Sequence, residues 1–338
     1  MQVSAQRMDT SVTDAKRVRC NLCPKACEIA PGQSGECRIR VNLDGKLVAV
    51  TYGYPCSAHI DPIEKKPMFH FLPGTGSLSI ATVGCNLHCL NCQNWEISQR
   101  NPEDEPAFAL PPEAIAPLAV QQGCQSVAYT YTDPVVYYEY AYDSCIKVRE
   151  AGLKNVLVTA GYINKQPLRD LCRYVDGAKI DLKSMSDTFY RDICGATLQP
   201  VLNALVVAKE AGVWVEVTNL VIPTLNDRDE DFQRLCTWMA ENMGKDTPLH
   251  FSAFFPNYKM TNLPPTPGDT LVRARDIARA EGLHFVYIGN VSAPDGETTH
   301  CPHCGKLLIE RRRFTIIENR LNGGRCPDCQ TALAGVWL

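Results

Sequence analysis

Three cysteines lie close together in one short segment, Cys85, Cys89 and Cys92, with the spacing C-x3-C-x2-C. In a helix-like loop, positions i, i+4 and i+7 share one face, so the three thiolates can converge on one small inorganic body. A structural zinc ion takes four protein ligands, whereas an iron–sulfur cubane with three cysteines keeps one iron open to a substrate. The spacing therefore favours a 4Fe-4S cluster that performs chemistry; three buried cysteines on a helix are the alternative.

Four more cysteines form two C-x2-C pairs near the end of the chain, separated by 21 intervening residues: Cys301, Cys304, Cys326 and Cys329. Such pairs predict a zinc ribbon with four thiolate ligands, and rubredoxin-like iron is the alternative. A tail of roughly 45 residues has too little core to fold without a metal, so we expect a structural role. The basic run 311–313 in this tail (Arg311, Arg312 and Arg313) is interpreted as a solvated strand edge.

A third set lies near the start of the chain, at Cys20, Cys23, Cys27 and Cys37. Its spacing differs from the bacterial ferredoxin run but suits a site with four cysteine ligands. Zinc, a second iron–sulfur cluster and metal-free cap cysteines all remain open, with zinc slightly favoured over a cluster. Most other cysteines lie in helical or strand-edge patterns and are interpreted as small buried hydrophobes: Cys124, Cys145, Cys172, Cys194 and Cys236.

The elements that must position these groups follow from hydrophobic periodicity. Short β-branched runs predict strands at residues 78–83, 126–131, 155–159, 177–182, 214–221, 249–254 and 284–288. Longer amphipathic runs predict helices at residues 112–121, 135–151, 166–174, 200–211, 229–243 and 270–281. Strands that alternate with helices predict βα units and a parallel sheet.

Six or so such units favour an α/β fold, a partial (β/α)6 TIM-like barrel, with an open doubly wound sheet as the alternative. The chain is thus predicted to comprise an N-terminal Cys-rich cap (1–73), the barrel (74–290) and a four-cysteine zinc-ribbon-like tail (291–338). A parallel barrel carries its chemistry at the carboxyl ends of its strands, and Cys85 follows the first of these.

The bulk composition narrows the partners and the compartment. A formal net charge of −3 gives no electrostatic reason to expect nucleic acid as a partner. The apolar runs are too short for a membrane helix, and residues 1–19 do not resemble a signal peptide. The 17 cysteines therefore predict metal sites in a reducing, cytoplasmic setting rather than disulfides.

The segment from Gly84 to Trp95 resembles the radical SAM (S-adenosylmethionine) superfamily, and this resemblance extends over about residues 74–290. The residues after Cys92, Gln-Asn-Trp, resemble the branch around pyruvate formate-lyase activating enzyme. With its N-terminal Cys-Asn-Leu-Cys-Pro and C-terminal Cys-Pro-x-Cys pairs, nearly everything after Val18 resembles the AmmeMemoRadiSam-system radical SAM proteins.

The resemblance implies a reaction. In that family the open iron binds the amino and carboxylate groups of SAM, and an electron from the reduced cluster splits a C–S bond to give methionine and a 5′-deoxyadenosyl radical. Cluster potentials span roughly −700 to +450 mV, and reduction of a sulfonium needs the low end. A donor of the flavodoxin or ferredoxin type is therefore implied.

The resemblance also implies residues that hold SAM. Asp133, after the second predicted strand, takes the place of the glutamate in the family's Gly-Gly-Glu; a helix N-cap is its alternative role. Asp181 and Lys183 match the family's Asp-Leu-Lys beside SAM, and strand alternation points both to the same side. Asn219, near the end of the fifth predicted strand, is a weaker candidate.

Two positions depart from the family pattern. Thr159 and Gly161 belong to a segment that resembles the family's Asp-Thr-Asn-Gly, but Val158 replaces its aspartate. Asn91 replaces an aromatic residue common before the third cysteine, and Trp95 can supply the missing ring or anchor the following helix. Three further aromatic residues can line a substrate mouth, although barrel packing is favoured for them: Phe254, Phe255 and Tyr258.

The resulting hypothesis is an activase-like radical SAM oxidoreductase that takes hydrogen from a protein partner, such as a glycyl-radical enzyme, or from a small molecule. Two other classes are weighed against it: a zinc-ribbon nucleic-acid-binding protein with a vestigial barrel, and an iron–sulfur redox sensor. The negative net charge and the intact three-cysteine motif disfavour the first of these.

Overall fold

The centre of the molecule is a sheet of eight strands, in the order β13-β12-β11-β10-β9-β8-β7-β6, in a computed structural model that describes residues 10–12 and 16–338. Strands β7 to β13 are parallel to their neighbours, whereas β6 pairs antiparallel with β7. From one edge to the other the strands are β6 (Ser57–Pro62), β7 (Gly76–Ala81), β8 (Ser126–Tyr129), β9 (Lys154–Thr159), β10 (Gly177–Asp181), β11 (Trp214–Val221), β12 (Leu249–Ala253) and β13 (Val286–Gly289).

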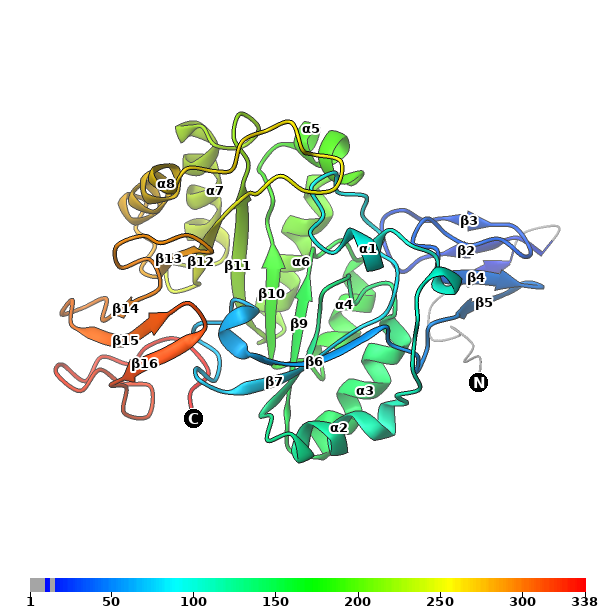
Figure 1. Ribbon diagram of the computed structural model, residues 1–338, viewed down its shortest axis with the longest axis horizontal. Coiled ribbons are helices and arrows are strands. Elements are labelled where there is room, and N and C mark those ends of the chain that lie inside the picture. The colour runs from blue at the N-terminus through cyan, green and yellow to red at the C-terminus, as the bar shows by residue number, and fades with distance from the viewer. Residues whose placement is uncertain (1–9, 13–15) are drawn as a thin grey trace.

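Helices follow most of the parallel strands and cover the outer face of the sheet (Figure 1). The parallel strands read as near-continuous apolar runs because both faces of the sheet are buried, and every residue of β8 is buried. The helices are α1 (Trp95–Ser98), α2 (Pro112–Gln121), α3 (Tyr138–Glu150), α4 (Lys165–Cys172), α5 (Asp187–Phe189), α6 (Leu198–Glu210), α7 (Asp229–Asn242) and α8 (Gly268–Ala280). Shorter turns of helix are η2 (Ile63–Lys65), η3 (Pro102–Asp104) and the π-helical η4 (Tyr190–Cys194).

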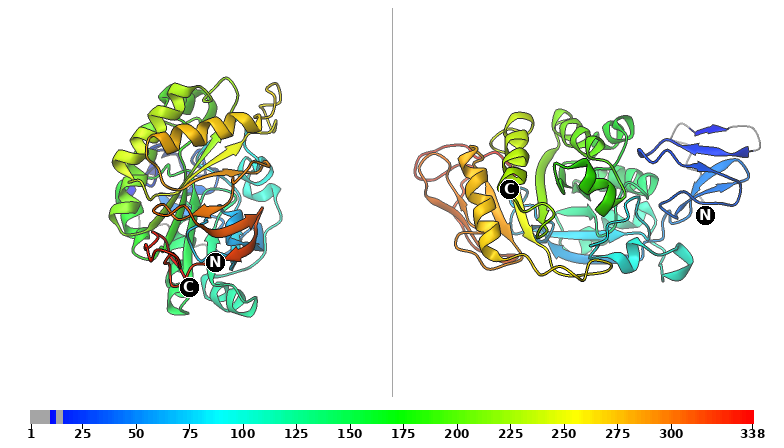
Figure 2. Two further views of the ribbon diagram at one scale, coloured as in Figure 1. Left: turned by 90° about the vertical axis from the view of Figure 1, so that its left-hand side faces the viewer. Right: turned by 90° about the horizontal axis from the view of Figure 1, so that it is seen from above.

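Two small cysteine-rich parts lie at opposite ends of the long axis of the molecule (Figures 1 and 2). At one end is a sheet of β1 (Thr10–Val12), β2 (Val18–Cys20) and β3 (Glu28–Ile29), beside the hairpin of β4 (Arg40–Leu43) and β5 (Lys46–Ala49). At the other end is the sheet of β14 (Thr299–His300), β15 (Leu307–Arg312) and β16 (Thr315–Asn319).

The predicted fold class is confirmed. Every strand and helix expected in the barrel segment is present, and the sheet is open because β6 and β13 form its two edges in the described part of the chain. Strand β6 lies within residues 1–73, yet it pairs with β7 along its whole length. The three-part division of the chain stays a prediction.

The C-terminal sheet is fastened by its own apolar cluster, in which Phe69 and Tyr287 of the barrel side pack with Cys301, Cys326 and Leu308. Arg311 corrects the sequence interpretation of a solvated basic edge: it is 5% exposed and donates to Phe69 O at 2.7 Å and to Thr299 Oγ1 at 2.8 Å. Its guanidinium also lies over the Phe69 ring. Only the next two arginines of the run are exposed.

Candidate functional site at the carboxyl ends of the strands

The loop after β7 carries Cys85, Cys89 and Cys92, each partly buried. It is irregular rather than helix-like, so the sequence expectation of a shared helix face is wrong, and tertiary hydrogen bonds hold the loop instead. His88 N donates to Cys194 O and Leu90 N to Ile193 O, both at 2.9 Å. The loop is thereby held against the end of η4, three strands away in the sheet.

A glycine is required where this loop begins. Gly84 has φ +94°, and a Cβ there would lie 2.6 Å from Cys37 O and 2.8 Å from Ile39 Cγ2. Any side chain would therefore push the N-terminal cap away from the cysteine loop. The N-terminal cap and the cysteine loop therefore pack directly against each other at Gly84.

The three thiols interact electrostatically. Burial, then the Asp133 carboxylate and the other two thiols raise the pKa of Cys85 well above its ordinary value. A hydrogen bond from Cys194 chiefly, and then the nearby Lys183 ammonium, lower the pKa of Cys89. Three soft ligands with a neighbouring cation fit an anionic iron–sulfur cluster.

Cys194 was interpreted from the sequence as a buried hydrophobe, and it is fully buried. The structure adds that its thiol lies at Cys89: a hydrogen bond from Cys194 is the largest effect that holds the pKa of Cys89 below its ordinary value. No signal in the sequence pointed to this pair, because the two residues lie on different elements and meet only through the fold.

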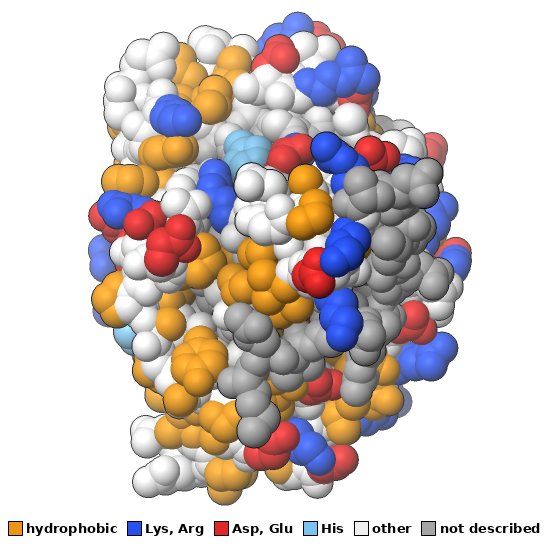
Figure 3. All heavy atoms as spheres, turned by 90° about the vertical axis from the view of Figure 1, so that its right-hand side faces the viewer, with side chains coloured by type: hydrophobic (Ala, Val, Ile, Leu, Met, Phe, Trp, Pro, Cys, Tyr) orange, Lys and Arg blue, Asp and Glu red, His pale blue; other side chains and the backbone are white. Residues whose placement is uncertain are grey.

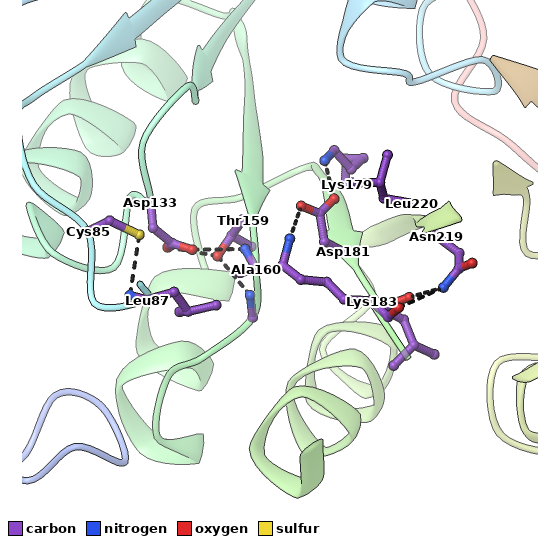
Figure 4. A network of polar contacts seen from close by, with 12 residues as sticks. Cys85, Leu87, Asp133, Thr159, Ala160, Lys179, Asp181, Lys183, Asn219 and Leu220 are labelled. Atoms are coloured by element: carbon purple, nitrogen blue, oxygen red, sulfur yellow. Dashed lines mark hydrogen bonds and ion pairs between the residues drawn. The ribbon is translucent and has the colours of Figure 1, made fainter. Parts of the chain in front are cut away.

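Asp133 lies in the loop after β8 and is 2% exposed (Figure 4). Its Oδ1 accepts from Thr159 Oγ1 at 2.9 Å and from Val135 N at 3.1 Å, and its Oδ2 accepts from Ala160 N at 2.8 Å. Helix α3 begins only at Tyr138, so Asp133 is not its N-cap. The carboxylate instead ties the end of β8 to the end of β9, beside Cys85.

Thr159 and Gly161 support the same junction. Gly161 N donates to Thr159 Oγ1 at 3.0 Å, and Gly161 has φ +69° with Ile180 Cγ2 only 3.0 Å from the place of a Cβ. A side chain here would be strained and would press on β10. These two residues shape the backbone next to Asp133.

At the end of β10, Asp181 pairs with two lysines (Figure 4). Lys183 Nζ lies 3.0 Å from Asp181 Oδ2, and Lys179 Nζ contacts Oδ1. Burial alone would raise the pKa of Asp181, but the two ammonium groups outweigh it and hold the pKa at about 2. The carboxylate is thus permanently charged. Lys179 was missed from the sequence, although its spacing of two from Asp181 is a signal that could have found it.

Asn219 on β11 joins this group from the next strand. Its Nδ2 donates to Leu182 O at 2.7 Å and to Lys183 O at 3.2 Å, which holds the backbone of Lys183 in place. Asn226 Nδ2 donates to the same Lys183 carbonyl at 2.7 Å. Asn219 is 2% exposed, and within the described residues its Oδ1 accepts no hydrogen bond. A buried acceptor of this kind is available to a bound ligand.

The aromatic candidates divide into two kinds. Phe254 is buried and packs in the core, as favoured from the sequence, whereas Phe255 is 45% exposed. Trp95 stacks on Tyr258, with ring centroids 5.3 Å apart and planes 13° from parallel. Lys259 N donates to Leu90 O at 3.0 Å, so the loop that carries Tyr258 lies against the cysteine loop. The stacked pair therefore borders the site.

The C-terminal cysteines come together as a compact group of four. Cys301, Cys304, Cys326 and Cys329 place their sulfur atoms within 4.8 Å of one another, with the Cys301–Cys329 and Cys304–Cys326 pairs at 3.6 and 3.7 Å. Thiolates bound to one tetrahedral zinc at about 2.3 Å stand at such separations. The four N-terminal cysteines also gather, around a single cavity.

An open parallel α/β sheet with a three-cysteine loop at its carboxyl edge defines a class of cluster-dependent enzymes.

Comparison with known proteins agrees with that class. A family model described as the radical SAM superfamily matches residues 79–236. The uncharacterized protein MJ0808 of Methanocaldococcus jannaschii is 49% identical over 318 residues, which cover 94% of this chain and 95% of that protein. The 4-hydroxyphenylacetate decarboxylase activating enzyme of Clostridium scatologenes is 25% identical over 119 residues, 34% of this chain and 38% of that enzyme.

Among solved structures, Streptococcus suis SuiB has a similar fold, with a TM-score of 0.51 and 15% sequence identity over 68% of this chain and 52% of SuiB. This chain thus spans about half the length of SuiB, which has also been solved bound to S-adenosylmethionine and to its precursor peptide SuiA. The chain belongs to the radical SAM superfamily, an assignment that implies an enzyme with a 4Fe-4S cluster and SAM. In the part of the chain that the structure describes, no helix is both long and apolar enough to cross a membrane.

Proposed function

We propose that this protein cleaves SAM reductively at a 4Fe-4S cluster held by Cys85, Cys89 and Cys92, and that the resulting 5′-deoxyadenosyl radical takes hydrogen from a peptide or protein substrate. The observation that carries this proposal is the meeting of the three-thiol loop with three ionisable side chains, Asp133, Asp181 and Lys183, at the carboxyl ends of β7 to β10. Parallel barrels carry their chemistry at this edge.

The cluster, when bound, supplies one electron and a vacant iron for the amino and carboxylate groups of SAM. The residues of the chain provide the surroundings. Lys183 offsets the negative charge of the thiolates and, with Asp181, offers a fixed pair of opposite charges to a zwitterionic ligand. Asn219 Oδ1 offers a buried acceptor to a hydroxyl or amino group. Asp133 keeps the β8 and β9 ends in register with the cysteine loop.

A macromolecular substrate is favoured over a small molecule by the rim of the site. Phe255 is exposed there, and the stacked Trp95–Tyr258 pair is only partly buried, which gives an apolar border that a peptide can contact. The similarity to an activating enzyme supports the same choice. Within this proposal a glycyl-radical enzyme is one candidate partner, and a flavodoxin or ferredoxin is the electron donor.

The competing nucleic-acid function lacks support. The basic run of the C-terminal sheet is partly internal, since Arg311 is buried in the protein. On the face that carries the N-terminal strands, positive and negative side chains are interspersed over the described residues (Figure 3). A nucleic-acid surface needs basic groups gathered in one stripe.

The test compares Cys85→Ala/Cys89→Ala/Cys92→Ala with Cys236→Ala, a control that removes a buried thiol outside the three cysteine sets. After anaerobic reconstitution and reduction with dithionite, we expect the triple variant to form no 5′-deoxyadenosine and to lose about four irons per chain. The control should match the wild type in both. SAM cleavage by the triple variant would refute the proposal.

A further inference from the structure

The N-terminal cysteines surround a cavity of their own. All four line it: Cys20 ends strand β2, and the loops of the cap carry the other three, Cys23, Cys27 and Cys37. Cys20 N donates to Cys27 O at 3.0 Å and Ala26 N to Cys23 O at 3.1 Å, so a tight backbone knuckle points these thiols inward. Burial chiefly, and then the thiols of Cys20 and Cys37, raise the pKa of Cys23, which places these sulfur atoms within electrostatic range of one another.

The spacing of these thiols differs from that of a single-ion site. Among the described residues, the C-terminal four are the one group whose sulfur atoms all approach within 4.8 Å. The N-terminal thiols share a cavity, but no three of them all lie within 4.8 Å of one another among the described residues, and neither do the three thiols of the radical SAM loop. Thiolates that each bind a different iron of a cubane are more widely separated than thiolates on one zinc. Among the described residues, the spacing of the N-terminal thiols therefore suits a cubane better than a single zinc ion.

The cavity also has buried N–H donors beside the thiols. Arg40 lines it, is 2% exposed, and forms a bidentate pair with Glu139 through Nη1 and Nη2 at 2.7 and 2.8 Å. Its Nε has no hydrogen-bond partner among the described residues. Asn86 also lines the cavity, and its side chain hydrogen-bonds Cys23, which partly offsets the effect of burial on the pKa of that thiol. An N–H beside cluster sulfurs stabilises their negative charge.

The cavity adjoins the radical SAM loop directly. Asn86 immediately follows Cys85, and Cys37 O lies against the backbone of Gly84. Lys25, also at the cavity, donates to Gly195 O at 2.6 Å, one residue after the thiol that contacts Cys89. Asn86 therefore lies between the two sites: it lines the cavity, and the residue before it is Cys85, a ligand of the proposed radical SAM cluster.

We propose that Cys20, Cys23, Cys27 and Cys37 bind a second 4Fe-4S cluster, which was the alternative to zinc in the sequence analysis. With four thiolate ligands it has no open iron, so its chemistry is one-electron exchange: it accepts an electron from a flavodoxin- or ferredoxin-type donor and passes one electron on. Its service as donor to the first cluster rests on the proposed function above, whereas its existence does not.

The experiment measures iron, sulfide and zinc in the anaerobically reconstituted full-length protein and three variants. Cys23→Ser/Cys27→Ser removes the two partly exposed N-terminal thiols, Cys85→Ala/Cys89→Ala/Cys92→Ala removes the first site, and Cys236→Ala is the control. We expect about eight irons per chain in the wild type and control, and about four in each of the other two, with zinc unchanged throughout.

Mössbauer and EPR spectra of the triple variant keep the proposal testable even where the N-terminal variant folds poorly. The cluster that remains in the triple variant should be a 4Fe-4S centre whose EPR signal does not respond to SAM. A triple variant without iron, or an N-terminal variant that loses zinc and keeps all its iron, overturns the second cluster. Either result leaves the proposed function intact, because SAM cleavage by the wild type tests that separately.

Discussion

The two cysteine sets at opposite ends of the molecule contain the same number of thiols but differ in spacing and in what they contact (Figure 2). The C-terminal set is compact, on a small antiparallel sheet that packs beside the amino ends of β11 to β13. The N-terminal set is wider and packs on loops at the carboxyl ends of the barrel strands.

The difference in location indicates a structural role for the C-terminal set and a role near the chemistry for the N-terminal set. The C-terminal set meets a buried polar network in which Glu216 accepts from His70 N at 2.7 Å, Phe69 N at 2.9 Å and the His250 ring at 2.8 Å. His70 in turn contacts Ala334 O and the Tyr287 hydroxyl. None of these groups reaches the three-cysteine loop. At the amino ends of barrel strands such networks stabilise the fold, whereas the N-terminal set borders reactive groups.

The largest expected effect follows from removal of the C-terminal thiols, which we propose as ligands of a structural zinc ion. In Cys301→Ser/Cys304→Ser, bound zinc should fall from about one to none per chain and the tail should unfold, because a structural zinc supplies about 10 kcal/mol or more to folding. Metal analysis and limited proteolysis of residues 291–338 measure both. Loss of iron instead of zinc would contradict the proposal that the compact C-terminal set of cysteines binds zinc.

Low pH should also destabilise the fold at the C-terminal end of the molecule. Burial chiefly lowers the pKa of His70 from 6.5 to about 4. Between these two pH values the unfolded chain binds a proton at His70, whereas the folded protein keeps the ring neutral. Stability is therefore lost as the pH falls from about 6.5 towards 4, by up to about 3 kcal/mol. His70→Asn should be less stable at pH 7 but should show a shallower decline in denaturant titrations. An unchanged slope would contradict this, and His59→Asn, at an exposed histidine, is the control.

At the chemical end, Lys183→Met should weaken SAM binding about 10- to 100-fold while iron content stays the same, since a charge-assisted contact contributes about 1.5–3 kcal/mol. The unaltered Lys179 still balances Asp181, so the strand end should persist. Equilibrium binding and the SAM-dependent EPR change measure the effect. Lys165→Met, on the surface of α4, is the matched control, and equal SAM affinity in both variants would remove Lys183 from the site.

The smallest expected effect concerns Cys194. Removal of its hydrogen bond to Cys89 in Cys194→Ala should lower the cluster potential by about 20–60 mV, because a donor to a ligand sulfur stabilises the reduced, more negative cluster. Iron content should not change, and redox titration followed by EPR gives the shift. Loss of iron would mean that Cys194 is a fourth ligand, which would remove the vacant iron that the proposed chemistry requires.

Much of the fold was readable from the sequence, because hydrophobic periodicity is a local property. Helix α2 and strand β11 have the bounds that the periodicity predicts, and the other barrel elements differ only at their ends. The three cysteine sets were equally visible, since most neighbouring cysteines in a set are separated by only two or three residues, which is a local spacing. Asp181 and Lys183 were found because strand alternation places them on one side.

Distances between elements were not readable. The approach of Cys194 to Cys89, the burial of Arg311 and the position of Asn86 between the two proposed cluster sites arise from residues far apart in the chain. By itself the sequence determined which thiols belong together and on which strand ends the charged groups stand. Only the tertiary structure decided how widely each set of thiols is spaced, because that spacing depends on how loops pack against one another rather than on the number of residues between the cysteines.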